Sequence, residues 1–506
     1  MKKQKILIYL APPPSEMTLG VNLDLAVKER KKGNEVILLC CDHSLGLCMQ
    51  NSRGNRFLCR FCEKCQQETI QRYLPNVQHI WMRDCLKKFG ISSYPELTYR
   101  NCGELMNLTW KGVEIGYGVM STYISLTRNL YPEINDESKH YFNALIREEI
   151  DTLAVIENMH HHFNFDLIVF QNGRGAQFKP IINFCQRESI DFWCTETIPN
   201  GDISFTNHFW NSYPHDAGSL KKKYQDFWNQ SHESKEEKTR IGRSFYENRR
   251  NSKPAGDVVY TKSQQKGLMP TTWRSDKENI VILNSSEDEY AAISKSFEEE
   301  KVFVSQLEGV KAIVRHYAND TSKHFTLRVH PHLRDIPYHY HTDIYKLDYP
   351  NLTVIPADSP ISTYALMDAA DKVVVFGSTA GIEASFWGKP VINLAPTFYN
   401  CLDVAYIPRL PEDVWKLIDT PSLSPRQSIF ALMYGYFTMS DKHQTTEILS
   451  LKYNALKVGH KKIIYYDWQT IFGSHLLFCF SKVIVGFIAK WNLTSKFKSL
   501  PQKEME

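Results

Sequence analysis

The stretch from 371 to 394 constrains the fold more than any other part of the chain. Residues 372–376 form a continuous β-branched and aromatic run, which is typical of a strand buried on both faces. A turn at 377–379 interrupts the run, a helix-compatible segment follows at 380–387, and 391–394 reads as the next strand. The pattern predicts one strand–helix–strand unit of a parallel α/β sheet.

The turn of this unit carries two hydroxyl groups, those of Ser378 and Thr379. Free backbone N–H groups at a helix start bind anions, so we predict that both residues contact a phosphate; the alternative is that they only cap the helix. Glu383 lies one turn into the helix. We predict that it lies near the ribose or sugar of a bound nucleotide, and the alternative is a surface position.

A second strand, at 325–329, ends in His330-Pro331. Ligands of open α/β sheets lie beyond the carboxyl ends of the strands, which is where His330 falls. We predict that His330 binds or protonates a departing phosphate and that Arg328 belongs to the same donor site. The alternative for His330 is an ordinary packed residue, and His332 is expected to point elsewhere.

A third strand, at 279–283, leads into Asn284-Ser-Ser-Glu-Asp-Glu289. Ser285 or Ser286 is a good helix N-cap, because the acidic residues that follow are favourable in a first turn. The competing interpretation is that the backbone of Ser285 and Ser286 lines the donor pocket.

The His330-Pro331 pair followed by Ser378-Thr379 resembles the two nucleotide motifs of bacterial transferases that use CMP-linked sugars, such as sialyltransferases and Kdo transferases. With Asn284–Glu289 and Asn172-Gly-Arg174, the chain resembles capsule and O-antigen polysaccharide biosynthesis proteins over roughly residues 1–410. The resemblance implies a GT-B fold, with two Rossmann-like domains facing a cleft and C-terminal helices. It also implies a glycosyltransferase that needs no catalytic metal.

The expected reaction moves a sugar, favoured to be Kdo or a related acidic sugar on CMP, to a capsular or lipopolysaccharide glycan that can be lipid-linked. Two alternatives stay open. A similar motif pair occurs in polymerases that use CDP-glycerol, which suggests a phosphotransferase. The Gly377-to-Glu383 turn is also similar to that of UDP-sugar transferases and epimerases.

In the N-terminal half, Asn172 and Arg174 follow a strand at 166–171, and Glu196 follows the next strand. We predict that Asn172 and Arg174 bind the acceptor. Glu196 is the candidate catalytic base for the acceptor hydroxyl, and Asp42 is the second candidate. The alternative for each is a structural hydrogen bond in a loop.

Five cysteines form a separate pattern. Cys59, Cys62 and Cys65 make two overlapping C-x-x-C pairs, and Cys41 and Cys48 lie upstream. Four thiolates suit tetrahedral zinc, so we predict a structural zinc on Cys41, Cys48, Cys59 and Cys62; the alternative is a set of buried thiols.

At 506 residues the chain exceeds one typical domain. We expect an acceptor-side domain at 1–260 with a cysteine-rich insertion at 41–66, a donor domain at 270–410 and C-terminal helices at 411–506. A net charge of +4 is too small to favour nucleic-acid binding. A non-catalytic zinc-containing assembly or nucleic-acid-binding factor is therefore the less favoured class.

The segment 475–491 is apolar, with only Lys482 and Lys490 charged. It suits the membrane interface, and the alternative is a buried helix. The chain shows no 18-residue uncharged apolar run, and its apolar start is too short for a signal peptide. We expect a cytoplasmic protein that associates peripherally with an anionic inner membrane.

Overall fold

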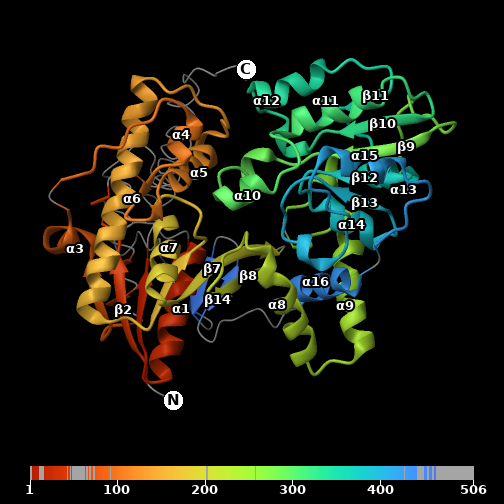
Figure 1. Cartoon of the computed structure of the whole chain (residues 1–506). Coiled ribbons are helices and arrows are strands. Elements are labelled where there is room, and N and C mark those ends of the chain that lie inside the picture. Colours follow the sequence, from red (N-terminus) through yellow and green to blue (C-terminus); the bar gives the residue numbers. More distant parts are fainter. Residues whose placement is uncertain are drawn as a thin grey trace, which may run out of the picture. The chain divides into compact units, whose positions relative to one another are not determined.

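The computed structural model of the chain describes residues 3–440, with gaps at 11–15, 48–62 and 201–202 and at single or paired positions elsewhere, and the short strands between 449 and 462. The chain divides into two compact units (Figure 1). Unit 1 comprises Met1–Pro214 and the described strands after Lys442, and unit 2 comprises His215–Asp441. The sequence placed the domain boundary at 260–270, so the charged helices before that point fall in unit 2.

Unit 1 is built on a sheet with a parallel core in the order β3-β2-β1-β6-β7. Antiparallel strands extend the sheet beyond β7. The strands of the unit are β1 (Lys5–Tyr9), β2 (Glu35–Cys40), β3 (Gln78–Trp81), β6 (Leu167–Gln171), β7 (Asp191–Asn200), β8 (Ile203–Trp210), β14 (Leu449–Lys452), β15 (Ala455–Val458) and β16 (Lys461–Lys462), with a separate hairpin of β4 (Thr109–Trp110) and β5 (Val113–Glu114). Its helices are α1 (Glu16–Lys31), α3 (Met82–Phe89), α4 (Cys102–Met106), α5 (Gly116–Thr127), α6 (Asp136–Phe163) and α7 (Lys179–Glu188).

Unit 2 is built on a five-stranded, wholly parallel sheet in the order β11-β10-β9-β12-β13. The strands are β9 (Glu278–Leu283), β10 (Lys323–Arg328), β11 (Leu352–Ile355), β12 (Lys372–Val375) and β13 (Val391–Asn393). The helices are α8 (Ala217–Gln230), α9 (Lys235–Arg250), α10 (Lys295–Glu299), α11 (Gln306–His316), α12 (His339–Thr342), α13 (Thr363–Ala369), α14 (Ala380–Phe386), α15 (Pro411–Asp419) and α16 (Ile429–Met439). Short 3₁₀ turns stand at η1 (Tyr260–Ser263), η2 (Glu287–Glu289), η3 (Pro331–Leu333), η4 (Asp343–Lys346) and η5 (Asn400–Leu402).

The two units share one strand order. In each, the first strand is central, the next two strands add on one side, and the chain then crosses to add two on the other side. This is the Rossmann order, in which ligands bind where the strand order reverses. The prediction of two Rossmann-like α/β domains is confirmed. The strands predicted at 279–283 and 372–376 are fully buried at their centres, because helices cover both faces of a parallel sheet.

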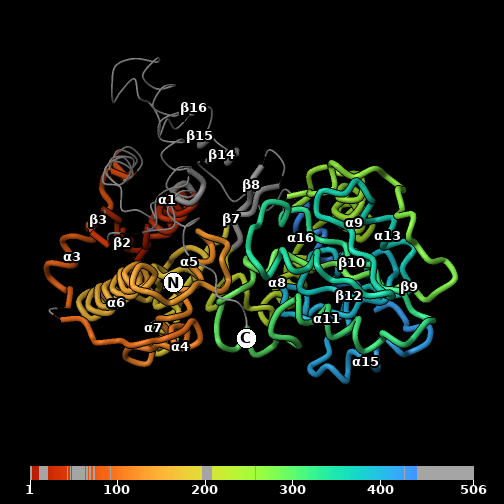
Figure 2. The backbone as a smooth tube through the Cα atoms, turned by 90° about the horizontal axis from the view of Figure 1, so that it is seen from above, coloured from red at the N-terminus to blue at the C-terminus, as the bar shows by residue number. Residues whose placement is uncertain are grey.

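Helix α16 lies beside α9 and contacts α8, and it also packs against the sheet helix α14 (Figure 1 and Figure 2). Glycines allow this close approach: a Cβ on Gly242 would lie 2.6 Å from the carbonyl oxygen of Leu432. Tyr246 of α9 stacks on Phe386 of α14 with ring centroids 3.8 Å apart. This packing fixes the last turn of α9 beside α14.

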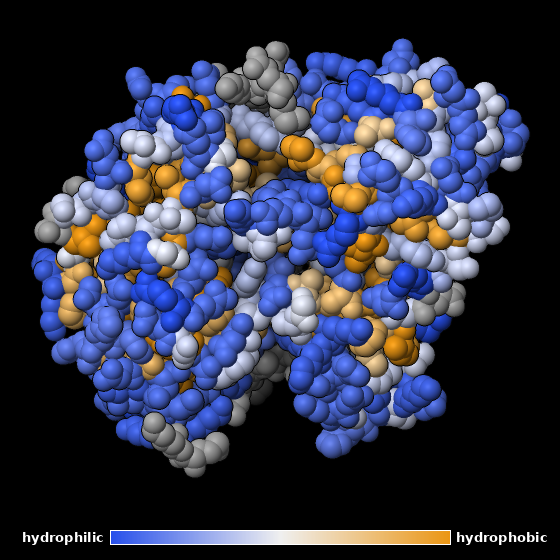
Figure 3. Space-filling view, in the orientation of Figure 1, coloured by the Kyte–Doolittle hydropathy of each residue, from blue (hydrophilic) through white to orange (hydrophobic). Residues whose placement is uncertain are grey.

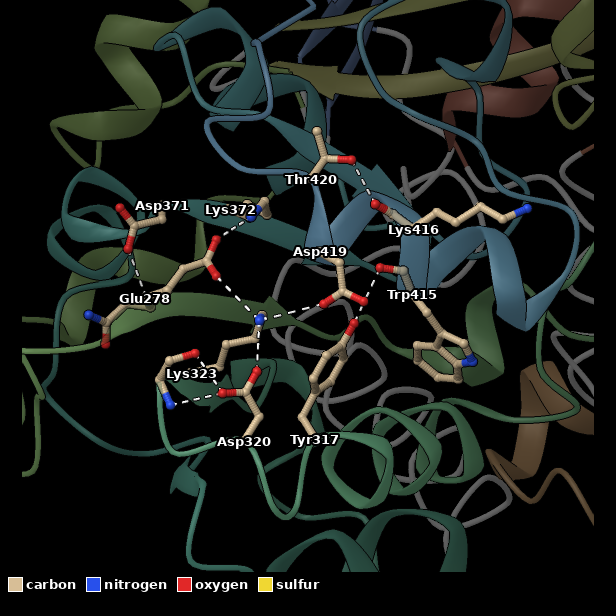
Figure 4. A network of polar contacts seen from close by, with 12 residues as sticks. Glu278, Tyr317, Asp320, Lys323, Asp371, Lys372, Trp415, Lys416, Asp419 and Thr420 are labelled. Atoms are coloured by element: carbon tan, nitrogen blue, oxygen red, sulfur yellow. Dashed lines mark hydrogen bonds and ion pairs between the residues drawn. The ribbon is translucent and has the colours of Figure 1, made fainter.

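The amino ends of the central strands of unit 2 carry a network of ion pairs (Figure 4). Lys323 Nζ lies 2.8 Å from Asp320 Oδ2, 3.5 Å from Asp419 Oδ1 and 3.8 Å from Glu278 Oε2. The buried Lys372 pairs with the same Glu278. Lys323 and Lys372 thus pair with carboxylates at the starts of the strands, and Asp371 accepts from the backbone N–H of Asn279 at 2.7 Å.

The face of the molecule in Figure 3 is mostly hydrophilic, with apolar side chains scattered among polar ones. No helix in the described part of the chain is long and apolar enough to cross a membrane. The segment 475–491, for which we expect a membrane-interface role, lies outside the described residues.

Candidate functional site

An open cavity lies in unit 2 at the carboxyl ends of β9, β10 and β12. It encloses about 860 Å³ of empty space, counting the solvent at its mouth. The residues lining it come from segments far apart in the sequence. Six of them are residues predicted for the donor site, namely Ser285, Ser286, His330, Ser378, Thr379 and Glu383.

Strand register explains why these residues meet. Arg328 at the end of β10 and Val375 at the end of β12 both stand opposite Leu283, the last residue of the central strand β9. The three strands therefore end level with one another. The segments that follow them open at the same edge of the sheet, at the point where the strand order reverses.

The turn after β12 is held by contacts from neighbouring loops. Gly377 adopts φ +75° and donates its backbone N–H to Asn393 Oδ1 at 2.9 Å. The Tyr399 hydroxyl donates to the carbonyl of Ser378 at 2.7 Å. Ser378 Oγ accepts from the N–H of Ala380 at 3.4 Å, while the N-cap position of α14 is Thr379, whose side chain makes no cap hydrogen bond. The turn therefore presents Ser378 and Thr379 to the cavity in a fixed conformation.

The hydroxyl of Ser285 forms its hydrogen bonds with other residues of the protein. Its Oγ donates to the Phe376 carbonyl at 2.8 Å and accepts from Gln306 Nε2 at 2.8 Å, while its backbone N–H donates to Gln306 Oε1 at 3.0 Å. These bonds tie the segment after β9 to the segment after β12. Ser286 Oγ donates to Asp288 Oδ1 at 2.8 Å.

His330 is half-buried at the cavity wall. Its backbone N–H donates to Asn284 Oδ1 at 2.8 Å, and its Nδ1 accepts from the N–H of His332 at 3.2 Å. Because Nδ1 is the acceptor, the neutral imidazole carries its proton on Nε2 and can donate it. His332 stacks on Tyr260, whose ring also meets His330 edge-on with centroids 5.0 Å apart.

Arg328 does not line the cavity. It is buried, and its guanidinium donates to the carbonyls of Pro356 and Ser359. Burial lowers the pKa of Arg328 to about 10. These contacts hold Arg328 at the end of β10, outside the cavity lining, and its role in the donor site stays a prediction.

Glu383 lies on the cavity wall and is 3% exposed, which excludes the alternative of a surface residue. Its Oε1 accepts from Arg249 Nε at 2.9 Å, and its Oε2 accepts from the Tyr364 hydroxyl. Both partners also line the cavity. Neither was predicted, because Arg249 ends a charged helix that reads as a solvated face and Tyr364 has no neighbouring motif.

The segment between α9 and β9 supplies a further wall that sequence reasoning missed. Val258, Val259, Tyr260, Thr261 and Gln264 line the cavity. The sequence indicates only a linker here, and no local signal distinguishes a linker from a pocket wall. The segment is held in place where Gln264 Oε1 accepts from the N–H of Thr363 at 2.8 Å.

In unit 1 the structure brings Asn172, Arg174 and Glu196 together. Asn172 Nδ2 donates to Glu196 Oε2 at 2.6 Å, and Asn172 Oδ1 accepts from the N–H of Arg174 at 3.2 Å. Arg174 Nε donates to Ser121 Oγ at 2.6 Å. Glu196 lies within β7, which continues to Asn200.

Asp42 makes structural contacts. It is 7% exposed, and its carboxylate accepts from the backbone N–H groups of Ser44 and Arg83 at 3.2 and 3.0 Å. Arg83 stands in the first turn of α3, so Asp42 holds the start of that helix. The structural alternative therefore accounts for Asp42.

The predicted zinc ligands Cys48, Cys59 and Cys62 lie outside the described residues, and so does Cys65. Cys41 is described and is half-buried. Among the residues that the structure describes, no group of three or more His, Cys, Asp or Glu side chains is arranged to hold a metal ion. The zinc prediction concerns residues beyond that set.

No protein-family model and no curated protein sequence matches the chain. Solved structures match the chain at low identity and with TM-scores below 0.5. A Thermosulfurimonas dismutans KpsC beta Kdo 2,4 transferase is 10% identical, with 54% of this chain and 80% of that chain covered and a TM-score of 0.35. The corresponding beta Kdo 2,7 transferase is 16% identical, covering 56% and 79% with a TM-score of 0.33.

A UDP-GlcNAc 2-epimerase from Neisseria meningitidis is 11% identical, with 86% of this chain and 97% of that chain covered and a TM-score of 0.27. These identities and TM-scores do not distinguish a transferase from an epimerase. The function is therefore argued from the cavity of unit 2 and from the motifs that line it.

Proposed function

We propose that the chain is a GT-B glycosyltransferase that binds a nucleotide sugar in the cavity of unit 2. One observation carries the proposal: residues after three adjacent strands, chosen from the sequence as nucleotide contacts, line a single cavity at the reversal of strand order. Rossmann-like sheets bind their ligands at this place.

The side chains that line the cavity would have different roles. Ser378 and Thr379 would contact the donor phosphate, and Glu383 would face the ribose. His330 would donate a hydrogen bond from its Nε2–H to the departing phosphate and stabilise the negative charge there, because Nδ1 already accepts a backbone hydrogen bond. The His-Pro and Ser-Thr motifs favour a CMP-activated acidic sugar such as Kdo.

The acceptor would bind to unit 1. Asn172 and Arg174 would contact it, and Glu196 would take the proton from its hydroxyl as that oxygen attacks the sugar. The hydrogen bond from Asn172 to Glu196 orients the carboxylate. A capsular or lipopolysaccharide glycan, free or lipid-linked, is the acceptor class that the motif resemblance implies.

A panel of nucleotides tests the donor assignment. CMP should raise the melting temperature more than UMP or CDP-glycerol, because the ligand stabilises only the folded state. RNA should leave it unchanged. A larger shift with UDP-sugars would instead favour the UDP-sugar transferase or epimerase alternative, and a larger shift with CDP-glycerol would favour the phosphotransferase.

Mass spectrometry then tests the reaction. Incubation with CMP-Kdo and a Kdo-terminated acceptor should extend the acceptor by one sugar, and the reaction should persist in a metal chelator. Release of CMP without extension of any glycan acceptor would argue against transfer. A thiol-bound structural zinc would be detected separately, by elemental analysis of the purified protein.

The cytoplasmic, peripherally membrane-bound location is a proposal of the same kind. Basic residues near an apolar segment gain about 1 kcal/mol each at an anionic surface. The protein should therefore sediment with anionic vesicles and be released by salt, and truncation before residue 475 should abolish sedimentation. Equal sedimentation of the truncated chain would contradict the role of this segment.

A further inference from the structure

Tyr260 packs against both histidines that follow β10, at the wall of the cavity. Its ring meets the His330 ring edge-on, with centroids 5.0 Å apart and the two planes at 68°. The same ring stacks on His332, with centroids 5.4 Å apart and the planes at 22°. Tyr260 belongs to η1 and the histidines to the segment after β10, so the packing joins two segments far apart in the sequence.

The imidazole of His330 needs more than its backbone to keep one orientation. The torsion between a tetrahedral carbon and a planar ring has two broad minima, so the backbone does not choose which way the ring faces. A half-turn about this torsion would exchange Nδ1 with a carbon and carry Nε2 to another place. The N–H of His332 donates to Nδ1 at 3.2 Å, at the long end of the usual range. The Tyr260 ring therefore supplies a second restraint.

Tyr260 is itself held through the ring on which it stacks. His332 Nδ1 lies 2.9 Å from Glu289 Oε1. An ionised carboxylate only accepts hydrogen bonds, so the proton of this contact is on His332. Glu289 lies in η2 after β9, and His332 lies in η3 after β10. Three turns from different parts of the chain thus form one row of side chains, namely Glu289, His332, Tyr260 and His330.

We propose that Tyr260 is a positioning residue for His330. Its ring keeps Nδ1 on the N–H of His332 and keeps the Nε2–H on the side of the departing phosphate. The inference rests on the proposed function and deepens it, because a hydrogen-bond donor stabilises developing charge best when it is held in place before the reaction. Tyr260 acts through His330 and not by contact with the nucleotide.

A double-mutant cycle on turnover tests this action through His330. Tyr260→Leu removes the ring and should lower kcat about tenfold at saturating donor, with the donor KM changed less than about twofold, because the contact that it loosens is made in the transition state. Tyr260→Phe keeps the ring and should restore most of the loss. In the His330→Ala background, Tyr260→Leu should cause no further loss, because the group that it positions is already absent.

The imidazole can also be observed without a substrate. In protein labelled with nitrogen-15 histidine, NMR of the ring nitrogens distinguishes a protonated nitrogen from one that accepts a hydrogen bond. Signals that disappear in His330→Ala identify His330. Wild type and Tyr260→Phe should show one form of this ring, with the proton on Nε2. Tyr260→Leu should show averaged or doubled ring signals.

Tyr345→Leu is the matched control. Tyr345 also meets a histidine edge-on in unit 2, His341 with centroids 5.2 Å apart, and it stands outside the described lining of the cavity. This variant should keep wild-type turnover and wild-type His330 signals.

His332→Ala gives a second route to the same test. It removes the stacking partner of Tyr260 and keeps the backbone N–H that donates to His330. His332 is 36% exposed, so the variant is expected to fold. It should lower kcat about threefold, a smaller loss than Tyr260→Leu because the Tyr260 ring is still present.

Two results would overturn the proposal and leave the nucleotide site standing. An equal loss from Tyr260→Leu with and without His330 would place Tyr260 in contact with the ligand. Unchanged His330 signals in Tyr260→Leu would show that the other contacts hold the ring by themselves. Absence of turnover with every nucleotide sugar would instead remove the proposed function, and the NMR comparison would then decide alone whether Tyr260 holds His330.

Discussion

The two edges of the unit 2 sheet hold polar side chains in opposite ways. At the amino edge, the charged side chains form ion pairs with one another: Glu278 pairs with both Lys323 and Lys372 (Figure 4). At the carboxyl edge, His330 and the Ser378–Thr379 turn line an open cavity and are held by backbone contacts. Charges that neutralise one another stabilise the fold, whereas groups held rigid beside a cavity remain available to a ligand.

This contrast separates stability from activity. Changes at the amino edge should lower the free energy of unfolding and spare nucleotide binding. Changes at the carboxyl edge should spare the fold and impair binding or turnover. The variants described next each change a side chain of unit 2 and compare its effect on stability with its effect on nucleotide binding or turnover.

The largest effect is expected on turnover, from a change at the carboxyl edge. His330→Ala removes the proposed hydrogen-bond donor to the leaving phosphate and should lower turnover about 100-fold, the usual scale for groups that stabilise developing charge. The melting temperature should change little, because the His330 side chain is half-buried and its backbone contact to Asn284 is retained. Turnover should be measured at saturating donor; a fully active variant would remove His330 from the mechanism.

The next effect is expected at the amino edge. Lys372→Met removes a cation that is 2% exposed and leaves Glu278 paired only with Lys323. Breaking a buried pair is costly, but Glu278 is 29% exposed, so we expect a loss of about 2 kcal/mol in the free energy of unfolding. Urea denaturation measures this loss.

Lys416→Met is the matched control, because Lys416 is 77% exposed and pairs with Asp413 at 3.4 Å. It should change stability by less than about 0.5 kcal/mol. Nucleotide affinity should be unchanged in both variants. A weakened affinity in Lys372→Met would show that the two edges are coupled.

A smaller, pH-dependent effect on the free energy of unfolding is expected at Glu287. Burial raises the pKa of Glu287 from 4.5 to about 7. The folded protein therefore binds the carboxyl proton of Glu287 more tightly than the unfolded chain does. The contribution of protonated Glu287 to the free energy of unfolding is fully present below pH 4.5 and is lost as pH rises through about 7. Glu287→Gln cannot ionise, and it should be more stable than wild type by about 1 kcal/mol at pH 8, with the difference shrinking toward pH 5.

Unfolding at both pH values checks this prediction. Glu289→Gln serves as a control for the loss of an acidic side chain in the same turn, because that side chain is 47% exposed. Equal stability of wild type and Glu287→Gln at pH 8 would show that Glu287 does not carry a buried charge.

Much of unit 2 could be predicted from local sequence. Buried runs of β-branched residues gave the strands, and turn residues at their ends gave His330, Ser378 and Glu383, because strand ends in a parallel sheet fall at one edge. Arg328, predicted for the same site, does not line the cavity, because strand periodicity does not say which way a side chain turns at the last residue. Arg249 was missed because it reaches the cavity only through the packing of α9, and Tyr260 was missed because it lies in a segment that reads as a linker.

The proposed function depends first on nucleotide binding at the carboxyl edge of the unit 2 sheet. Hydrogen–deuterium exchange with and without CMP measures both edges in one experiment. The account predicts protection of backbone amides in 284–290 and 376–383, and no change in 318–323 at the amino edge. Protection confined to the amino edge or to unit 1, or unchanged exchange at a saturating CMP concentration, would contradict it.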